Sequence, residues 1–153
     1  MSNDLHELRI ERILDASRQA VWRCWTEPDL LMQWFCPVPW RVTEARLDLR
    51  PGGEFLARMA GPDGETEAVP GVFLEVVPQV RLVHTDAFLP GWVPNPDPFM
   101  LAIIEFADRG TQTHYVARAR HWHAEKMQQH AAMGFHAGWN AAADQLEALA
   151  RTL

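Results

Sequence analysis

The sequence has few of the residues on which covalent catalysis and disulfide bonding depend. Its 153 residues include two cysteines, Cys24 and Cys36, one lysine, Lys126, and two serines, Ser2 and Ser17. The cysteines form neither a CxxC pair nor a disulfide framework, so we expect reduced, buried thiols. A single lysine argues against Schiff-base chemistry, and neither serine lies in a Gly-x-Ser-x-Gly elbow. We therefore predict no catalytic nucleophile.

Long apolar runs and basic runs are also missing. No apolar segment approaches the ~20 residues that a membrane span requires, and residues 1–4 are polar rather than typical of a targeting segment. The formal charge of −6 comes from 14 basic and 20 acidic side chains, with no basic run longer than two residues. This pattern argues against nucleic-acid binding. We expect one cytoplasmic domain spanning residues 1–153, without membrane insertion.

Large aromatic rings are what the sequence has in excess. Seven tryptophans and seven phenylalanines occur beside a single tyrosine, Tyr115. Rings of this size fill a core, but when they pack around a gap they also form the wall of an apolar pocket. The composition is compatible both with a filled core and with an apolar pocket.

Hydrophobic periodicity predicts an α+β domain dominated by antiparallel strands. Alternating apolar residues predict a first strand near residues 8–14. An N-cap at Ser17 then opens a helix, which breaks before Pro28 and restarts as a second short helix. Turn signals such as Pro62-Asp63-Gly64 separate further alternating segments, typical of an antiparallel meander. These further strand candidates are residues 42–49, 55–59, 72–77, 80–85, 100–106 and 111–121.

The last thirty or so residues predict one long helix. Apolar residues recur there at intervals of three and four positions, from Phe135 through Trp139 to Leu153. Gly134 and Gly138 lie beside this stripe, although a glycine costs about 1 kcal/mol in a helix interior. Two such glycines indicate that the helix backbone approaches a sheet or a ligand closely.

The order of the sequence motifs resembles that of a known superfamily. The motifs that carry the resemblance are, in order, Trp22, Thr26-Glu27-Pro28, Trp34-Phe35, Pro51-Gly52-Gly53-Glu54-Phe55, Asp63-Gly64, Gly71-Val72-Phe73-Leu74-Glu75-Val76 with Pro78 and Arg81-Leu82-Val83, and Gly134-Phe135 with Gly138-Trp139. Over essentially the whole chain they are similar to the START-like (SRPBCC) superfamily. Within it, they are similar to the family named for the activator of the heat-shock protein 90 ATPase.

That resemblance implies a helix-grip fold. Its parts are a curved antiparallel sheet of about six or seven strands, one long C-terminal helix that the sheet wraps, and two short helices after the first strand. It also implies a hydrophobic cavity between sheet and helix. It does not imply one activity, because the superfamily includes lipid carriers, polyketide cyclases, hormone receptors and co-chaperone domains.

Strand alternation predicts which side chains face such a cavity. In residues 111–121 the charged Arg118 and Arg120 should meet solvent, which turns Tyr115, Ala117 and His121 inward. Among the inward residues, His84, Tyr115 and His121 are the polar groups able to orient a ligand. The predicted ligand-binding cavity is lined by Trp34, Phe55, Ala57, Met59, Leu82, His84, Met100, Ile104, Phe106, Tyr115, Ala117, His121, Phe135, Gly138 and Trp139.

The segment 89–98 contains four of the eleven prolines, so we expect a stiff loop without regular structure. Its exposed aromatic residue, Trp92, is a candidate lid, and a plain connector is the alternative.

Seven histidines raise the question of a metal site. His121 and His123 share one strand face, and His130 and His136 follow them. However, no carboxylate or cysteine lies at ligand spacing nearby, and on one helix the last two would point about 120° apart. We predict no metal and no cofactor.

A binding module that encloses a small hydrophobic or aromatic ligand is the leading functional hypothesis, so an enzyme is the less favoured reading. One alternative is a cyclase- or aromatase-like enzyme, with His84 or His121 as general acid/base and Tyr115 as oxyanion partner. Another is a co-chaperone-type protein-interaction domain, which an exposed apolar patch on the outer sheet face would favour. A homodimer is compatible with all three.

Overall fold

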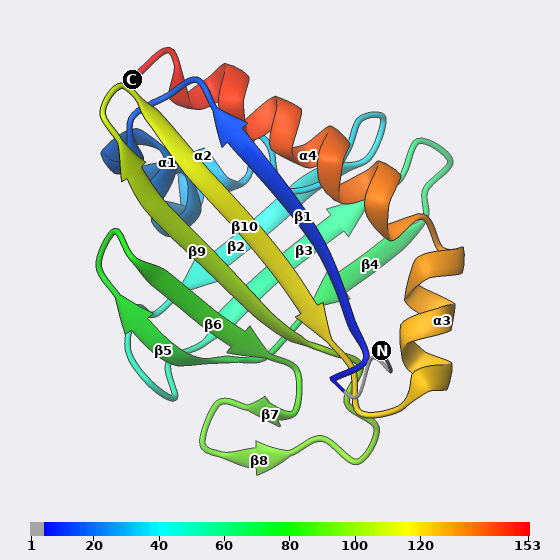
Figure 1. The fold of residues 1–153 in the computed structure, drawn as a ribbon. Helices are drawn as coiled ribbons and strands as arrows, with labels where there is room; N and C mark the ends of the chain where they lie inside the picture. The colour runs from blue at the N-terminus through cyan, green and yellow to red at the C-terminus, as the bar shows by residue number, and fades with distance from the viewer. Residues whose placement is uncertain (1–4) are drawn as a thin grey trace.

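The structure, a computed structural model, describes residues 5–153. Figure 1 shows strands and helices arranged as an open sheet with a long helix lying alongside its first strand. In chain order the elements are β1 (Glu7–Leu14), α1 (Arg18–Thr26), α2 (Pro28–Leu31), β2 (Arg41–Leu47), β3 (Phe55–Ala60), β4 (Thr66–Val69), β5 (Val72–Val77), β6 (Arg81–Thr85), β7 (Phe88–Leu89), β8 (Val93–Pro94), β9 (Leu101–Arg109), β10 (Gln112–Arg120), α3 (Ala124–Ala132) and α4 (Phe135–Ala150).

All the strand pairs are antiparallel, and they form two main sheets. Five strands pair in the order β1-β10-β9-β6-β5, and β2-β3-β4 form a second, three-stranded sheet. A single bridge between Glu54 and Val72 connects the two. The expected α+β helix-grip fold is confirmed, with the correction that the sheet is interrupted between β3 and β5 rather than continuous.

The first helical segments form where their end signals predicted. Ser17 caps α1, since its hydroxyl oxygen accepts a hydrogen bond from the amide of Ala20 at 3.2 Å. Pro28 begins α2, where a missing amide hydrogen costs nothing. Leu31 and Trp34 then turn inward and are buried. These two helices close one end of the fold.

The predicted single C-terminal helix is wrong in one respect. The chain forms two helices, α3 and α4, which are separated by Met133 and Gly134. Gly134 has a φ of +95°, a left-handed conformation that glycine adopts at no steric cost. Gly134 therefore ends α3 and redirects the chain, whereas Gly138 alone lies within a helix.

Two further boundaries differ from the sequence-based expectation. The segment 89–98 contains regular structure after all, because β7 and β8 pair as a small hairpin. The strand β4 was not predicted, since Thr66–Val69 is mostly exposed and carries no apolar alternation.

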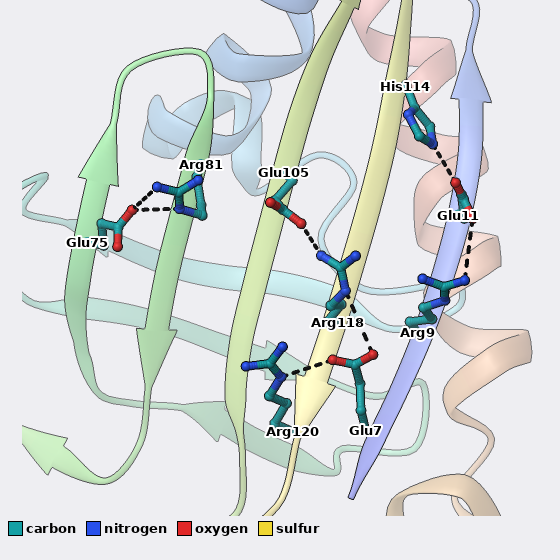
Figure 2. A network of polar contacts seen from close by, with 9 residues as sticks. All are labelled: Glu7, Arg9, Glu11, Glu75, Arg81, Glu105, His114, Arg118 and Arg120. Carbon is teal, nitrogen blue, oxygen red and sulfur yellow. Dashed lines mark hydrogen bonds and ion pairs between the residues drawn. The ribbon is translucent and has the colours of Figure 1, made fainter. Parts of the chain in front are cut away.

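The alternation predicted for β10 is confirmed. Thr113, Tyr115, Ala117 and Ala119 are all buried, with exposed fractions of 0% to 3%. The opposite face of β1, β9 and β10 carries charged side chains instead, which form the ion pairs drawn in Figure 2. Among the described helices, none combines the length and the apolar character that crossing a membrane requires.

Candidate functional site

A pocket of about 730 Å³ lies between the helices and the two sheets. Its walls come from β1, α1 and the segment after α2, from β3, β4 and the residues next to β4, from the end of β6 and the loop that precedes β9, and from β10, α3 and α4. The lining residues are Ile10, Trp25, Trp34, Phe35, Cys36, Pro37, Trp40, Met59, Glu67, Ala68, Val69, Pro70, His84, Thr85, Asp86, Phe99, Met100, Tyr115, Gln129, His130, Met133, Gly134, Phe135, Gly138, Trp139 and Ala142.

Hydrogen bonds hold α4 on both sides of this pocket. The side-chain amide of Gln145 donates to the carbonyl oxygens of Trp34 at 3.0 Å and of Cys36 at 2.9 Å. From β1, the Arg12 guanidinium donates to the carbonyl oxygen of Asn140 at 3.2 Å. The helix is therefore tied to the segment after α2 and to the large sheet, which fixes the width of the pocket.

Aromatic rings form much of the wall. Trp25 packs edge-on against Trp34 and Phe35, with ring centroids 5.0 Å and 5.8 Å apart. On α4, Phe135 and Trp139 lie 4.4 Å apart. Pairs at these separations contribute about 0.5–1.5 kcal/mol beyond the area they bury, so the wall is well ordered.

Tyr115 is the one tyrosine of the sequence, and it lines the pocket together with Trp25. The indole N–H of Trp25 donates to that hydroxyl oxygen at 3.1 Å. Complete burial raises the pKa of Tyr115 above its usual value, so the phenol stays protonated. Because the indole only donates, the phenolic hydrogen remains available to an acceptor in the pocket.

His84 on β6 is a second polar residue of the pocket lining. Its ring stacks on Phe55 with centroids 3.9 Å apart, and only 3% of the residue is exposed. Burial lowers the pKa of His84 to about 3, so the imidazole is neutral at physiological pH. None of the hydrogen bonds among the described residues involves its ring nitrogens, and the residue lines the pocket, so a water molecule or a ligand can serve as their partner.

A pair of histidines lies at the α3 end of the pocket. The Nε2 atom of His121 is 2.9 Å from Nδ1 of His130, and Nδ1 of His121 is 2.7 Å from the carbonyl oxygen of His6. Burial lowers the pKa of both rings, that of His130 to about 4. Both are therefore neutral, and His130 reaches the pocket.

The loop between β6 and β9 is fixed at the pocket edge by Asp86. Its carboxylate accepts hydrogen bonds from the amides of Phe99 at 2.9 Å and Met100 at 3.1 Å. Asp86 and Glu67 are the carboxylates of the lining, and no lysine or arginine accompanies them among the described lining residues. The local charge disfavours an anionic ligand.

About half of the predicted cavity residues line this pocket. Those that do are Trp34, Met59, His84, Met100, Tyr115, Phe135, Gly138 and Trp139. The others face inward as expected but belong to the packed core instead, away from the lining. They are Phe55, Ala57, Leu82, Ile104, Phe106, Ala117 and His121, all of which are buried. Alternation predicts the inward face of a strand, but it does not show where along the strand the filled core ends.

Several lining residues were missed by the sequence-based prediction. Trp25 and Phe35 come from α1 and from the segment after α2, and their aromatic character was the available signal. Phe99 and His130 were not found because the loop anchored by Asp86 and α3 meet only in the tertiary structure. No local sequence pattern predicts that these two residues contact each other.

Trp92, the candidate lid, lies outside the lining. Its ring covers Gly52, where an added Cβ would lie 2.7 Å from the indole, and packs edge-on against Phe88 with centroids 5.7 Å apart. In the structure this tryptophan therefore fixes the β7–β8 hairpin against the turn before β3, so it is not placed as a lid.

The cysteines and the candidate metal ligands were also considered as functional groups. Cys24 and Cys36 are free and buried, and burial raises the pKa of Cys24 to about 11, which keeps that thiol protonated. Among the described residues no three histidine, cysteine or acidic side chains are placed to share a metal ion. A second hollow, of about 410 Å³, is lined in part by the charged Asp15 and Arg151 and contains no aromatic residue among the described lining, so it is the poorer candidate for an apolar ligand.

Comparisons with known proteins extend this description. Residues 15–151 match the model of the family described as activator of Hsp90 ATPase homolog 1-like protein. A crystal structure of a protein from Nitrosomonas europaea is 39% identical, with a TM-score of 0.93 over 99% of this chain and 97% of that one. No curated protein matches this chain.

Two more distant structures share the architecture. A protein from Mycobacterium smegmatis is 27% identical, with a TM-score of 0.81 over 97% of this chain and 92% of that one. The AHSA1-like protein from Aeromonas hydrophila is 22% identical, with a TM-score of 0.72 over 95% and 92% of the two chains, which shows the fold alone. By its sequence from residue 15 to residue 151, this chain belongs to the family of activator of Hsp90 ATPase homolog 1-like proteins.

Proposed function

We propose that this protein is a binding module that encloses a small hydrophobic or aromatic molecule between the sheets and α4. The observation that carries the proposal is the pocket of about 730 Å³, walled by aromatic rings and containing the polar groups of His84, Tyr115 and His130. Small-molecule sites are usually of this size, mostly apolar, with a few placed polar groups.

The electrostatics of the pocket favour a neutral ligand. His84 and His130 are neutral because burial lowers their pKa values to about 3 and about 4. Tyr115 is protonated, and the lining carboxylates Asp86 and Glu67 repel an anion. An aromatic molecule without a carboxylate therefore fits better than a fatty acid.

The enzyme alternative receives less support from the same residues. A general base works best with a pKa near the operating pH, whereas burial lowers that of His84 to about 3. His121 does not line the pocket, and its two ring nitrogens already have partners in His6 and His130. The polar groups are suited to orient a ligand rather than to transfer protons.

The co-chaperone alternative predicts an apolar docking patch on the outer sheet face. That face carries charged side chains instead, as Figure 2 shows for β1, β9 and β10. Arg118 contacts both Glu105 and Glu7, while Arg120 lies 2.9 Å from Glu7. This distribution favours an internal ligand over an apolar protein contact at that face.

Native mass spectrometry of the purified full chain tests the proposal. We expect the wild-type protein to retain a small molecule or to take up an added neutral aromatic compound with one-to-one stoichiometry. Gly138→Leu places a side chain into the pocket and should abolish the adduct. Ala137→Leu adds the same side chain one position earlier, at an exposed residue outside the lining, and should retain it. An adduct of equal abundance in both variants would contradict the proposal.

A further inference from the structure

The chain of hydrogen bonds through His6, His121 and His130 determines where the imidazole protons lie. The carbonyl oxygen of His6 can only accept, so Nδ1 of His121, 2.7 Å away, carries a hydrogen. A neutral imidazole has one hydrogen, and Nε2 of His121 therefore has a lone pair. That lone pair faces Nδ1 of His130 at 2.9 Å, which must donate. The remaining nitrogen of His130, Nε2, is consequently an acceptor.

The same histidines are held in place by their neighbours. The backbone amide of His121 also donates to the His6 carbonyl oxygen, at 3.2 Å, so one acceptor holds both the backbone and the ring. The ring of His130 contacts those of Phe99, Phe135 and Trp139, with centroids 4.8, 5.1 and 5.9 Å away. These contacts leave the ring little freedom to rotate.

The acceptor nitrogen of His130 has no protein donor among the described residues. The residue lines the pocket and only 7% of it is exposed, so Nε2 has to be satisfied from inside the pocket. Of the three aromatic neighbours, Trp139 carries an indole N–H group, but its ring only packs edge-on against His130, with centroids 5.9 Å apart, and makes no hydrogen bond to it. A ligand or a water molecule supplies the missing hydrogen.

We propose that Nε2 of His130 is a fixed hydrogen-bond acceptor that selects ligands carrying a hydroxyl or N–H group, and that His121 is the positioning residue that fixes its tautomer. The inference rests on the proposed function, because it names the ligand class of the same pocket. The preferred ligand is a neutral aromatic molecule with a hydroxyl or N–H donor. The parent hydrocarbon and a methyl ether of the same ring fill the pocket equally well but lack that donor.

The tautomer can be measured without any ligand. In the full chain labelled with ¹⁵N-histidine, NMR should show His130 protonated at Nδ1 and unprotonated at Nε2 at neutral pH. His121→Phe removes the acceptor for Nδ1, and we expect His130 to shift toward the Nε2-protonated form, which a merely structural role of His121 would not produce. His130 protonated at Nε2 in the wild-type protein would overturn the proposal.

Ligand selection is tested with 2-naphthol, 2-methoxynaphthalene and naphthalene as probes in equilibrium dialysis. We expect 2-naphthol to bind about tenfold more tightly than its methyl ether, in keeping with one added hydrogen bond. His130→Phe should abolish this preference while still binding naphthalene. The control His136→Gln, at an exposed residue outside the lining, should preserve it.

The outcomes separate the two proposals. If 2-naphthol and its ether bind equally, or if His130→Phe keeps the preference, the acceptor role of His130 is overturned and the binding function stands. If none of the three probes binds the wild-type protein, the proposed function is contradicted, and the ligand selection falls with it.

Discussion

The indole Nε1 of Trp25 lies 3.1 Å from the hydroxyl oxygen of Tyr115, and this contact determines which hydrogen-bonding group Tyr115 offers to the pocket. Because an indole only donates, Tyr115 accepts from it and keeps its own hydrogen for a partner in the pocket. Tyr115 therefore presents a donor, whereas His130 presents an acceptor at the α3 end. A ligand pairs with both residues only if it carries an acceptor for Tyr115 and a donor for His130.

Tyr115→Phe should destabilise the protein. The substitution leaves the buried indole N–H of Trp25 without its acceptor, and an unsatisfied buried donor costs about 1–3 kcal/mol. Urea denaturation of the variant and the wild-type protein measures the difference in the free energy of unfolding. In the double variant with Trp25→Phe the two effects should be less than additive. A change in stability below about 0.5 kcal/mol for the single variant would show that the hydrogen bond is not maintained.

The two glycines four residues apart should respond with opposite signs to alanine. Gly134 has a φ of +95°, so Gly134→Ala forces a side chain into the left-handed region at a cost of about 1–2 kcal/mol. Gly138 lies inside α4, and an added Cβ would meet no atom within 4 Å, so Gly138→Ala should gain up to about 1 kcal/mol. Thermal melts of the two variants provide the comparison. Destabilisation by both would indicate that Gly138 packs against the sheet after all.

Stability should fall as the pH is lowered from about 7 to about 5. The usual histidine pKa of 6.5 applies to the unfolded chain, whereas burial lowers that of His84 to about 3 and of His130 to about 4. The unfolded state therefore takes up more protons, and the stabilisation present above about pH 6.5 is lost as the pH falls toward those lower values. Each group contributes at most about 1.4 kcal/mol per pH unit.

Urea unfolding at several pH values in this window measures that slope. His84→Phe keeps an aromatic ring against Phe55 but removes one titrating group, so its slope should be shallower. His136→Gln, at an exposed position, is the matched control and should follow the wild-type protein. Equal slopes for all three proteins would contradict the buried, neutral state of His84.

Chelator treatment should leave the melting temperature unchanged. His121 and His130 are partners of each other, and the described residues place no third ligand beside them. A structural zinc site normally needs four ligands, and its loss would lower stability. A drop in melting temperature with EDTA that zinc restores would show that the histidine pair binds metal.

Sequence periodicity predicted the strands well because burial on one face imposes alternation. In β10, Tyr115 and Ala117 are buried as expected, and Arg118 lies on the charged outer face. The sequence could not show that Ala117 is covered by the core while Tyr115 reaches the pocket. That difference depends on how α1 and the other helices pack over the sheet, which is not encoded in the strand itself.

The break at Gly134 and the histidine pair show a second limit of prediction from one sequence. Two glycines beside an apolar stripe are equally compatible with a continuous helix and with a turn, and only the conformation of Gly134 distinguishes them. That turn places the ring of Phe135 against that of His130, whereas the contact of His130 with His121 forms across the connection between β10 and α3. Contacts that arise through a turn have no periodic signature.

The most direct test of the binding proposal uses the seven tryptophans as internal reporters. Trp25, Trp34, Trp40 and Trp139 line the pocket, whereas Trp22, Trp92 and Trp122 do not. In ¹H–¹⁵N spectra recorded during a titration with 2-naphthol, we predict that the indole signals of the first four shift and saturate together while the other three stay in place. Shifts at Trp92 or Trp122 with unchanged pocket indoles, or no shift at any of the seven, would contradict a ligand enclosed between the sheets and α4.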